Sequence, residues 1–211
     1  KISETKKPVI LSTGASTMDE IDQAVKILES GTEEICIMQC NTNYTGSIKN
    51  INFQNLNVLR TFEKKWPKLI LGLSDHTAGH SSVLGAISFG ARIIEKHFTD
   101  DNSRNGPDHS FSMNPKSWKL MVDNARELES SFGIHEKKVE DNEKETIVVQ
   151  RRSIRFKCSK KADEIIELAD LEFLRPCPEN SFNPMHTKKI VGKKLIRDKK
   201  KGEEIYPEDL D

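Results

Sequence analysis

The sequence predicts an α/β fold, in which a parallel sheet covered by helices is followed by a smaller domain. Between residue 8 and about residue 133, four short apolar segments alternate with four segments of helical period. The apolar segments are nearly continuous, as is typical of parallel strands. A polar cluster follows each of them. Four βα units are half of a (β/α)8 barrel or a small open sheet, and the polar clusters favour the barrel, whose active site lies at the carboxyl ends of its strands.

The predicted strands comprise residues 8–11, 35–40, 69–73 and 91–94. The helices between them carry start and stop signals. Thr17 and Glu20 have capping-box spacing, and Gly31 ends the helix that follows. Asn114 and Pro115 begin the last helix, with the cap and the first-turn proline in their preferred places.

The chain changes character after residue 133. Residues 134–146 are charged and almost without apolar side chains, which predicts a solvated linker or an exposed helix. We therefore expect a barrel half at 1–133, a charged linker at 134–149 and a small β domain at 150–211. Its β-prone segments are residues 147–149, 153–156 and 171–174. Residues 160–171 loosely resemble residues 199–210, and the lysines that begin both stretches predict solvated turns.

Composition excludes several classes of protein. The formal net charge of zero argues against a dedicated nucleic-acid binder. No apolar run approaches the roughly 20 residues that span a bilayer, and no signal peptide is visible, so we expect no membrane association. The four cysteines form no C-x-x-C pair, which predicts reduced, buried thiols in a cytoplasmic protein. Because the first residue is Lys, we expect the chain to be part of a longer protein.

Two predicted strands end in similar polar clusters, Ser74-Asp75-His76 and Glu95-Lys96-His97. Because the carboxyl ends of neighbouring parallel strands meet at one edge, we expect the two histidines to share that edge. Neutral imidazoles there suit a catalytic metal. We expect Asp75 to cap the helix that follows.

Several motifs resemble those of the sialic acid synthase family, which makes N-acylneuraminate-type nonulosonic acids. They are PVILSTG at 8–14, GLSDHT at 72–77, EKHFT at 95–99 and GPDH at 106–109. Further along, RRS at 151–153 and LRP at 174–176 resemble the family's C-terminal antifreeze-like (SAF) domain. The motifs occur in the family's order and cover essentially the whole chain.

The resemblance implies a (β/α)8 barrel, of which only the C-terminal half is present, followed by a small β-clip domain. It implies the condensation of phosphoenolpyruvate with an N-acyl-hexosamine, either N-acetylmannosamine-like or a 2,4-diacetamido-trideoxyhexose. The products are a nine-carbon acid of the sialic, legionaminic or pseudaminic type and phosphate. A divalent metal, Mn²⁺ or Mg²⁺, is implied and no organic cofactor. The family forms homodimers in which the small domain of one chain caps the barrel of the other.

The resemblance also implies roles for individual residues. His76 and His97 match the family's metal-binding histidines, and Ser74 matches a serine that contacts phosphate. Sugar-binding residues of the family match Tyr44 and Asp108 here. Arg175 matches an arginine that reaches the N-acyl group from the partner subunit. Glu95 precedes His97 by two residues, so we expect it to share the same strand face and to help orient the catalytic site.

The sequence departs from the family in three ways. Asn43-Tyr44-Thr45 replaces a usual Tyr-Pro motif, and Arg175-Pro176-Cys177 replaces a usual Arg-Pro-Gly, which leaves the choice of sugar open. The barrel half that supplies the family's phosphoenolpyruvate-binding lysines and two key glutamates is missing. We therefore expect the isolated 211-residue chain to be inactive and poorly folded.

Two other functions remain compatible with these residues. One is a different metal-dependent barrel enzyme of the phosphoenolpyruvate or aldol type that uses the same two histidines. The other is a non-catalytic carbohydrate-binding relative.

Overall fold

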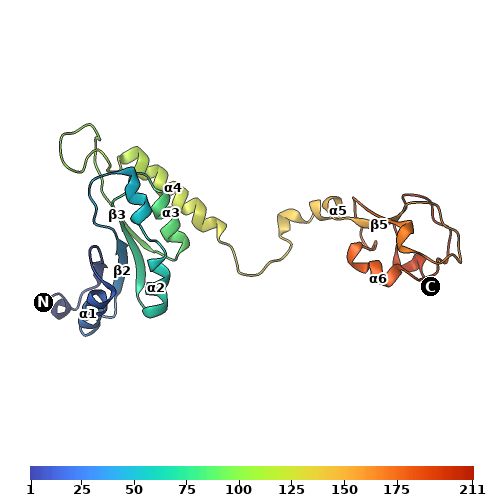
Figure 1. The fold of residues 1–211 in the computed structure, drawn as a ribbon, viewed down its shortest axis with the longest axis horizontal. Coiled ribbons are helices and arrows are strands. Elements are labelled where there is room, and N and C mark those ends of the chain that lie inside the picture. Colours follow the sequence, from blue (N-terminus) through green and yellow to red (C-terminus); the bar gives the residue numbers. More distant parts are fainter. The chain divides into compact units, whose positions relative to one another are not determined.

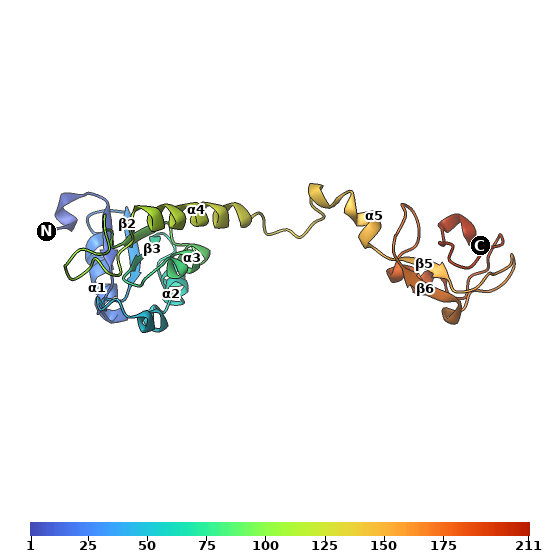
Figure 2. The same cartoon turned by 90° about the horizontal axis from the view of Figure 1, so that it is seen from above.

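The computed structural model describes residues 1–211, which form two compact units, Lys1–Gly133 and Ile134–Asp211. Each unit is described by itself (Figures 1 and 2). No helix in the chain is long and apolar enough to cross a membrane.

The first unit is built on a four-stranded parallel sheet of order β1-β2-β3-β4, in which neighbours in sequence are neighbours in space. The strands are β1 (Val9–Ser12), β2 (Ile35–Cys40), β3 (Ile70–Asp75) and β4 (Ile93–Lys96). The prediction of an α/β fold with a parallel sheet is thereby confirmed. The strand ends differ from the predicted ones by at most two residues.

Four helices accompany the sheet, namely α1 (Met18–Glu29), α2 (Val58–Lys65), α3 (Ser81–Ser88) and α4 (Pro115–Ser131). A capping box begins α1 at Thr17, as the sequence predicts. The predicted cap at Asn114 begins α4 and is also a capping box, with Pro115 in the first turn. The helix α3 lies beside α4 in both views (Figures 1 and 2). All four helices are amphipathic, and their apolar faces turn toward the sheet.

Apolar side chains from the helices and from alternate strand positions form one core in this unit. Its buried members are Ile21, Val25, Ile37, Leu59, Phe62, Trp66, Leu71, Leu73, Val83, Ala86, Ala91, Met113 and Met121. This core holds the strands in a fixed register. The loops that follow all four strands therefore meet at the carboxyl edge of the sheet, where the polar clusters lie.

The outer strands β1 and β4 each have one unpaired edge. Ile10 of β1 is 57% exposed, and Ile70 at the start of β3 is also exposed. An unpaired strand edge with exposed apolar side chains can pair with further strands. The sheet is therefore half of a barrel in strand number, with both edges open.

The second unit contains an antiparallel pair, β5 (Ser153–Phe156) and β6 (Leu171–Leu174), at the residues predicted to be strands. The unit also contains two short α-helices, α5 (Thr146–Gln150) and α6 (Thr187–Ile190), and four single-turn 3-10 helices. The prediction of a β segment at 147–149 is wrong, because these residues lie in α5. The unit has its own core, formed by Ile154, Phe156, Ile166, Leu171, Ile190, Leu195 and Ile205.

The loose sequence resemblance inside the second unit is a structural repeat with an offset of 39 residues, from Lys160 to Lys199 (199 − 160 = 39). The N–H of each of these lysines donates to the carbonyl oxygen of the other at 2.8 Å. Lys160 Nζ lies 2.9 Å from Asp170 Oδ2, and Lys199 Nζ lies 2.9 Å from Asp209 Oδ2. The two copies are thus related by an approximate two-fold arrangement.

The prediction that both lysine stretches are solvated turns is wrong for the first lysine of each stretch. Lys199 is 8% exposed, and the side chain of Lys160 is 16% exposed. A charged amine is buried only when it is paired, and each has the carboxylate ten residues further on as its partner. The lysines that follow them, Lys161 and Lys200, are exposed as predicted.

Candidate functional site

The two histidines lie side by side at the carboxyl edge of the sheet. His76 directly follows β3 and His97 directly follows β4. Their ring centroids are 5.1 Å apart, and the ring planes cross at 69°. The spacing follows from the parallel register, in which Asp75 is opposite Lys96, so the next residue of each strand points to the same side.

Two residues before the histidines, Ser74 and Glu95 form a second cross-strand pair on the same face of the sheet. Ser74 is opposite Glu95 in the register, and its hydroxyl donates to Glu95 Oε1 at 2.8 Å. Ser74 is buried, whereas Glu95 is exposed in this half of the barrel. The structure thus places Glu95 on the face of His97 that the sequence predicts, with Ser74 as its hydrogen-bond partner.

The surroundings of His76 favour a neutral ring with one free nitrogen. Its Nδ1 lies 3.0 Å from the carbonyl oxygen of Asn41, which can only accept, so Nδ1 carries the proton and Nε2 keeps a lone pair. Cys40 Sγ lies 4.0 Å from the same Nδ1. Burial, helped by the nearby His97, lowers the pKa of His76 below 6.5. Near pH 7 this imidazole is therefore uncharged, and its Nε2 lone pair is available to a metal ion.

His97 faces the carboxylate of Asp108, whose Oδ2 lies 3.6 Å from Nδ1. This distance is longer than a direct hydrogen bond. The backbone carbonyl of Asp108 is held by Ser112, which donates from its N–H at 3.2 Å and from its hydroxyl at 2.6 Å. Phe111 contacts the other side of His97, with ring centroids 5.4 Å apart. The loop that carries Asp108 is therefore fixed next to the histidine pair.

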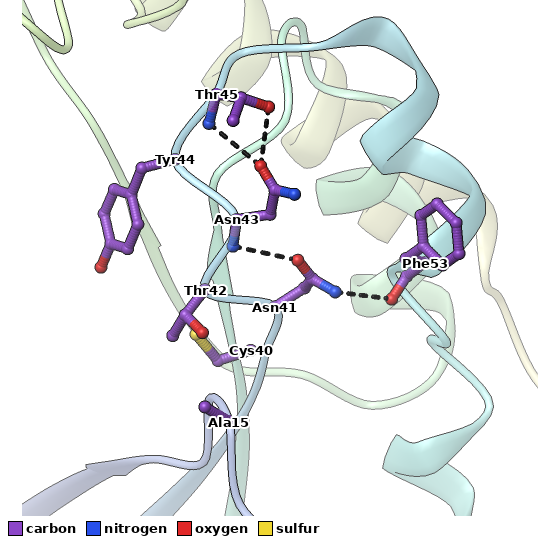
Figure 3. Close-up of a pocket in the computed structure, with 8 residues that line it drawn as sticks. All are labelled: Ala15, Cys40, Asn41, Thr42, Asn43, Tyr44, Thr45 and Phe53. Atoms are coloured by element: carbon purple, nitrogen blue, oxygen red, sulfur yellow. Dashed lines mark hydrogen bonds between the residues drawn. The ribbon is translucent and has the colours of Figure 1, made fainter.

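Tyr44 covers both histidines with its ring. The centroid distances are 4.2 Å to His76 and 5.4 Å to His97, and the tyrosine is half exposed. Its loop is ordered by two asparagines. Asn41 Oδ1 accepts from the N–H of Asn43, and Asn43 Oδ1 accepts from the N–H and the hydroxyl of Thr45 (Figure 3). A side chain with a phenolic hydroxyl is thus presented at the edge of the histidine site.

A pocket of about 830 Å³ adjoins this loop. It is lined by Ala15, Cys40, Asn41, Thr42, Asn43, Tyr44, Thr45 and Phe53. Tyr44 and Phe53 project to opposite sides of the loop, and Asn41 Nδ2 ties the loop to the carbonyl of Phe53 at 3.2 Å (Figure 3). A Cβ on Gly14 would collide with Thr42, so only glycine lets the loop after β1 come this close. The lining is rich in amide and hydroxyl groups, which suit a polyhydroxylated ligand.

The histidine pair fits a metal as a partial set of ligands. No cluster of three or more His, Cys, Asp or Glu side chains in residues 1–211 is arranged to hold a metal ion. The two imidazoles are nevertheless adjacent, and His76 presents a free Nε2 with its Nδ1 already bonded, which is the usual arrangement of a metal-ligating histidine. A metal held by two ligands keeps open positions for substrate oxygens.

Arg175 belongs to the second unit and is exposed. Its loop is fixed at the residues that follow it. The carbonyl oxygen of Pro176 accepts from Ser153 Oγ at 2.8 Å and from Arg155 Nη2 at 3.1 Å, and Cys177 N–H donates to the carbonyl of Val148 at 2.8 Å. Cys177 occupies the position of a usual glycine without a positive φ angle. The loop therefore presents Arg175 to solvent on a fixed backbone.

The sequence predicts no role for Lys96 and the wrong role for Asp75, because it does not predict the ion pair between them. The prediction that Asp75 caps the next helix is wrong, because α3 begins six residues later, at Ser81. Asp75 instead accepts from the N–H and the hydroxyl of Thr77, both at 2.8 Å, and pairs with Lys96. The signal that could reveal this pair is an acidic residue and a basic residue before two histidines on neighbouring strands.

Two curated proteins are similar to this chain over all or nearly all of its length. The uncharacterised protein MJ1065 of Methanocaldococcus jannaschii is 36% identical over 211 residues, which are 100% of this chain and 61% of that protein. The N,N'-diacetyllegionaminic acid synthase of Campylobacter jejuni is 33% identical over 208 residues, 97% of this chain and 60% of that protein. This chain therefore spans about 60% of the length of these curated relatives.

A solved structure has the same fold. The spore coat polysaccharide biosynthesis protein SpsE of Bacillus subtilis superposes with a TM-score of 0.58 and 25% identity, over 99% of this chain and 62% of that one. The NeuB family model ends at residue 137, so the assignment of residues 150–211 to an antifreeze-like domain stays a prediction. The model of the NeuB family matches residues 1–137, and we conclude that this chain belongs to the NeuB family.

Proposed function

We propose that the protein to which this chain belongs condenses phosphoenolpyruvate with an N-acyl-hexosamine to give a nine-carbon nonulosonic acid and phosphate. The observation that carries the proposal is the grouping of His76, His97 and Tyr44 at the carboxyl edge of a parallel sheet in a chain of the NeuB family. The relative from Campylobacter jejuni, a legionaminic acid synthase by name, supports an acceptor of the 2,4-diacetamido-trideoxyhexose type alongside N-acetylmannosamine.

In the proposed reaction, carbon 3 of phosphoenolpyruvate forms a bond with the aldehyde carbon of the open-chain sugar. Water adds to carbon 2, the bond between carbon 2 and the phosphate oxygen breaks, and phosphate leaves. The aldehyde oxygen becomes a hydroxyl and takes up one proton. Carbon 2, which then bears a hydroxyl from water, becomes the ketone of the product as phosphate departs and that hydroxyl loses its proton.

We assign His76 and His97 to a divalent ion, which when bound would act as a Lewis acid toward the sugar aldehyde. The neutral state of His76 supports this assignment, because a protonated imidazole cannot ligate. Imidazole donors suit Mn²⁺ better than Mg²⁺, which prefers oxygen ligands and holds its waters. We therefore expect Mn²⁺ to bind more tightly than Mg²⁺.

The remaining residues would bind and orient the substrates. Ser74, buried next to Glu95, would contact the phosphate, and Glu95 would fix the direction of the serine hydroxyl. Tyr44 contacts both histidine rings and Asp108 lies beside His97, so both would contact the sugar. The pocket that Asn41 and Asn43 line would hold the sugar's acylamino and hydroxyl groups.

The second unit would complete the site in a homodimer. Its exposed Arg175, on the loop fixed at Pro176, would reach the N-acyl group bound in the partner's barrel, with that unit acting as a cap. Both substrates are metabolites of the cytoplasm, and we expect the enzyme to work there.

The experiment that tests the proposal uses the complete natural protein with Mn²⁺ and phosphoenolpyruvate. A panel of N-acylmannosamines and 2,4-diacetamido-trideoxyhexoses is supplied, and mass spectrometry follows the nine-carbon acid. Formation of the acid with one class of sugar identifies the acceptor. Products only from pentose or tetrose phosphates would show a different barrel enzyme. Sugar binding without any product would show a carbohydrate-binding relative.

A further inference from the structure

A buried ion pair lies on the opposite face of the two strands that carry the histidines. Asp75 precedes His76, Lys96 precedes His97, and the two are opposite each other in the parallel register. Lys96 Nζ lies 2.7 Å from Asp75 Oδ2, and the two side chains are 2% and 0% exposed, respectively. Because side chains alternate along a strand, this pair points away from the face that holds Ser74, Glu95 and the imidazoles.

The same pair fixes the backbone on both sides of His76. Asp75 Oδ1 accepts from the N–H and the hydroxyl of Thr77, both at 2.8 Å. Lys96 Nζ donates to the carbonyl oxygen of Thr77 at 2.7 Å. The pairing of β3 with β4 ends at Asp75 and Lys96, so no β3–β4 ladder bond holds His76. His97 is held on its other side, where its carbonyl oxygen accepts from the N–H of Met113 at 2.9 Å. The ion pair thus holds the backbone just beyond the end of the β3–β4 pairing, at Thr77.

Stability alone is a poor explanation for this pair. Removing two charges from water costs several kcal/mol per ion, and the attraction between them repays that cost only partly. Apolar residues of similar volume often serve a fold equally well. The pair does, however, allow only one geometry, because Lys96 must reach Asp75 and the Thr77 carbonyl together. Because Asp75 and Lys96 each lie one residue before a histidine, this fixed geometry also determines where the two histidines lie.

We propose that Asp75 and Lys96 are positioning residues for the histidine site. They lock the ends of β3 and β4 so that His76 and His97 stay adjacent, with the His76 ring bonded to Asn41. Ser74 and Glu95 make the corresponding link on the other face. The inference rests on the proposed function, because it concerns the metal-binding geometry of those two histidines.

The test compares the complete natural protein with Asp75→Asn/Lys96→Met, which removes both charges and keeps the Asx-type bond to Thr77. The matched control is Asp209→Asn/Lys199→Met, which removes a buried ion pair in the second unit. Electron paramagnetic resonance of free Mn²⁺ gives the dissociation constant. In the metal-free protein, NMR follows the Nδ1 proton of His76. Loss of a group that orients metal ligands weakens binding by roughly 10- to 100-fold.

We expect that loss of Mn²⁺ affinity, and an altered His76 ring signal, only in the Asp75→Asn/Lys96→Met variant. An unchanged ring signal with Mn²⁺ affinity within about twofold of wild type would overturn the positioning role. A changed ring signal in a protein whose wild type binds no Mn²⁺ would support the positioning role and refute the proposed metal site. His76→Ala defines the signal and the affinity that belong to that site.

A milder variant keeps the inference testable if the double variant does not fold. Thr77→Val removes the hydroxyl that donates to Asp75 and leaves both charges in place. Because the ion pair stays, Thr77→Val should weaken Mn²⁺ binding by roughly tenfold, the lower end of the range for groups that orient metal ligands. Unchanged binding and an unchanged His76 signal in Thr77→Val would count against the proposal.

Discussion

At the scale of single residues, the surroundings of His76 decide what the site can bind. A carbonyl oxygen occupies Nδ1, burial disfavours the charged ring, and the rings of Tyr44 and His97 contact it at steep angles. Burial and the neighbouring His97 disfavour the charged ring and outweigh the Asn41 carbonyl, which by itself would favour it and which leaves Nε2 free. A ring in this state is a ligand at neutral pH without any rearrangement.

The first prediction concerns the protonation of His76. In the metal-free protein its pKa should be lower than 6.5, because burial and the neighbouring His97 both disfavour the cation. A ring whose pKa is lowered by folding contributes its full stability above pH 6.5, and that contribution falls as the pH drops from 6.5 toward the folded-state value. An NMR titration of the His76 ring checks this, and a midpoint at or above 6.5 would contradict it.

The second prediction concerns the four free thiols. Burial raises the pKa of Cys36 to about 11. The prediction that the thiols are buried is wrong for Cys158, which is exposed. Thiolates, not thiols, react with alkylating reagents. At pH 8, iodoacetamide should therefore modify Cys158 first and leave Cys36 untouched in the folded protein, which peptide mass spectrometry can follow. Early labelling of Cys36 would show that β2 is not packed as described.

The sequence predicts the adjacency of His76 and His97, because strand ends in a parallel sheet meet at one edge and both motifs follow apolar strands. It does not predict the partner of Asp75 or the burial of Lys199. Both depend on a partner outside the local segment, Lys96 on the neighbouring strand in one case and Asp209 ten residues further on in the other. A charged residue is predicted to be exposed unless an oppositely charged partner can be identified, and the local sequence does not identify one here.

At the scale of elements, β5 and β6 form at the predicted residues, whereas the β-branched stretch at 147–149 becomes helical. β-branched residues favour strands because their side chains pack against those of a neighbouring strand. Residues 147–149 belong to no sheet and have no such neighbour. The carbonyl of Val148 is used instead by Cys177, in the loop of Arg175. Tertiary context has therefore overridden a local preference.

The third prediction uses the repeat in the second unit as an internal comparison. Asp209, fully buried, accepts from Lys199, Arg197 and the N–H of Tyr206. Asp209→Ala should cost about 3–5 kcal/mol, because it leaves a buried charge unpaired. Its counterpart Asp170 is 16% exposed, so Asp170→Ala should cost about 1–2 kcal/mol.

Denaturant unfolding of the two variants checks this order, and equal losses would contradict it. Burial alone would raise the pKa of Asp209, but the hydrogen bonds from Lys199, the Tyr206 backbone and Arg197 lower it below 3.8. A lowered carboxyl pKa gives stability that is present above 3.8 and is lost as the pH falls through the folded value. Asp209→Ala should remove this acid dependence.

At the scale of the whole molecule, the two units have separate cores. Side chains of the first core all come from residues before 134, and those of the second all come from residues after 150. Separate cores of this kind are the mark of domains that fold independently. The first unit, in contrast, leaves both edges of its sheet open.

The fourth prediction follows from the separate cores. Residues 134–211, expressed alone, should fold cooperatively, because their seven core residues are buried by the unit itself. Residues 1–133 alone should self-associate through the open edges of β1 and β4. NMR dispersion and size-exclusion chromatography of the two pieces check both statements. A collapsed NMR spectrum for residues 134–211 would show that the second unit depends on contacts outside itself.

The central claim is that His76 and His97 form the reactive site of a nonulosonic acid synthase, and one assay tests it most directly. Phosphate release from phosphoenolpyruvate is measured with Mn²⁺ and the preferred N-acyl sugar in the complete natural protein and in His76→Ala and His97→Ala. We predict sugar-dependent release by the wild type and a loss of at least about 100-fold in both variants. Release that persists in either variant at the wild-type rate would contradict the claim.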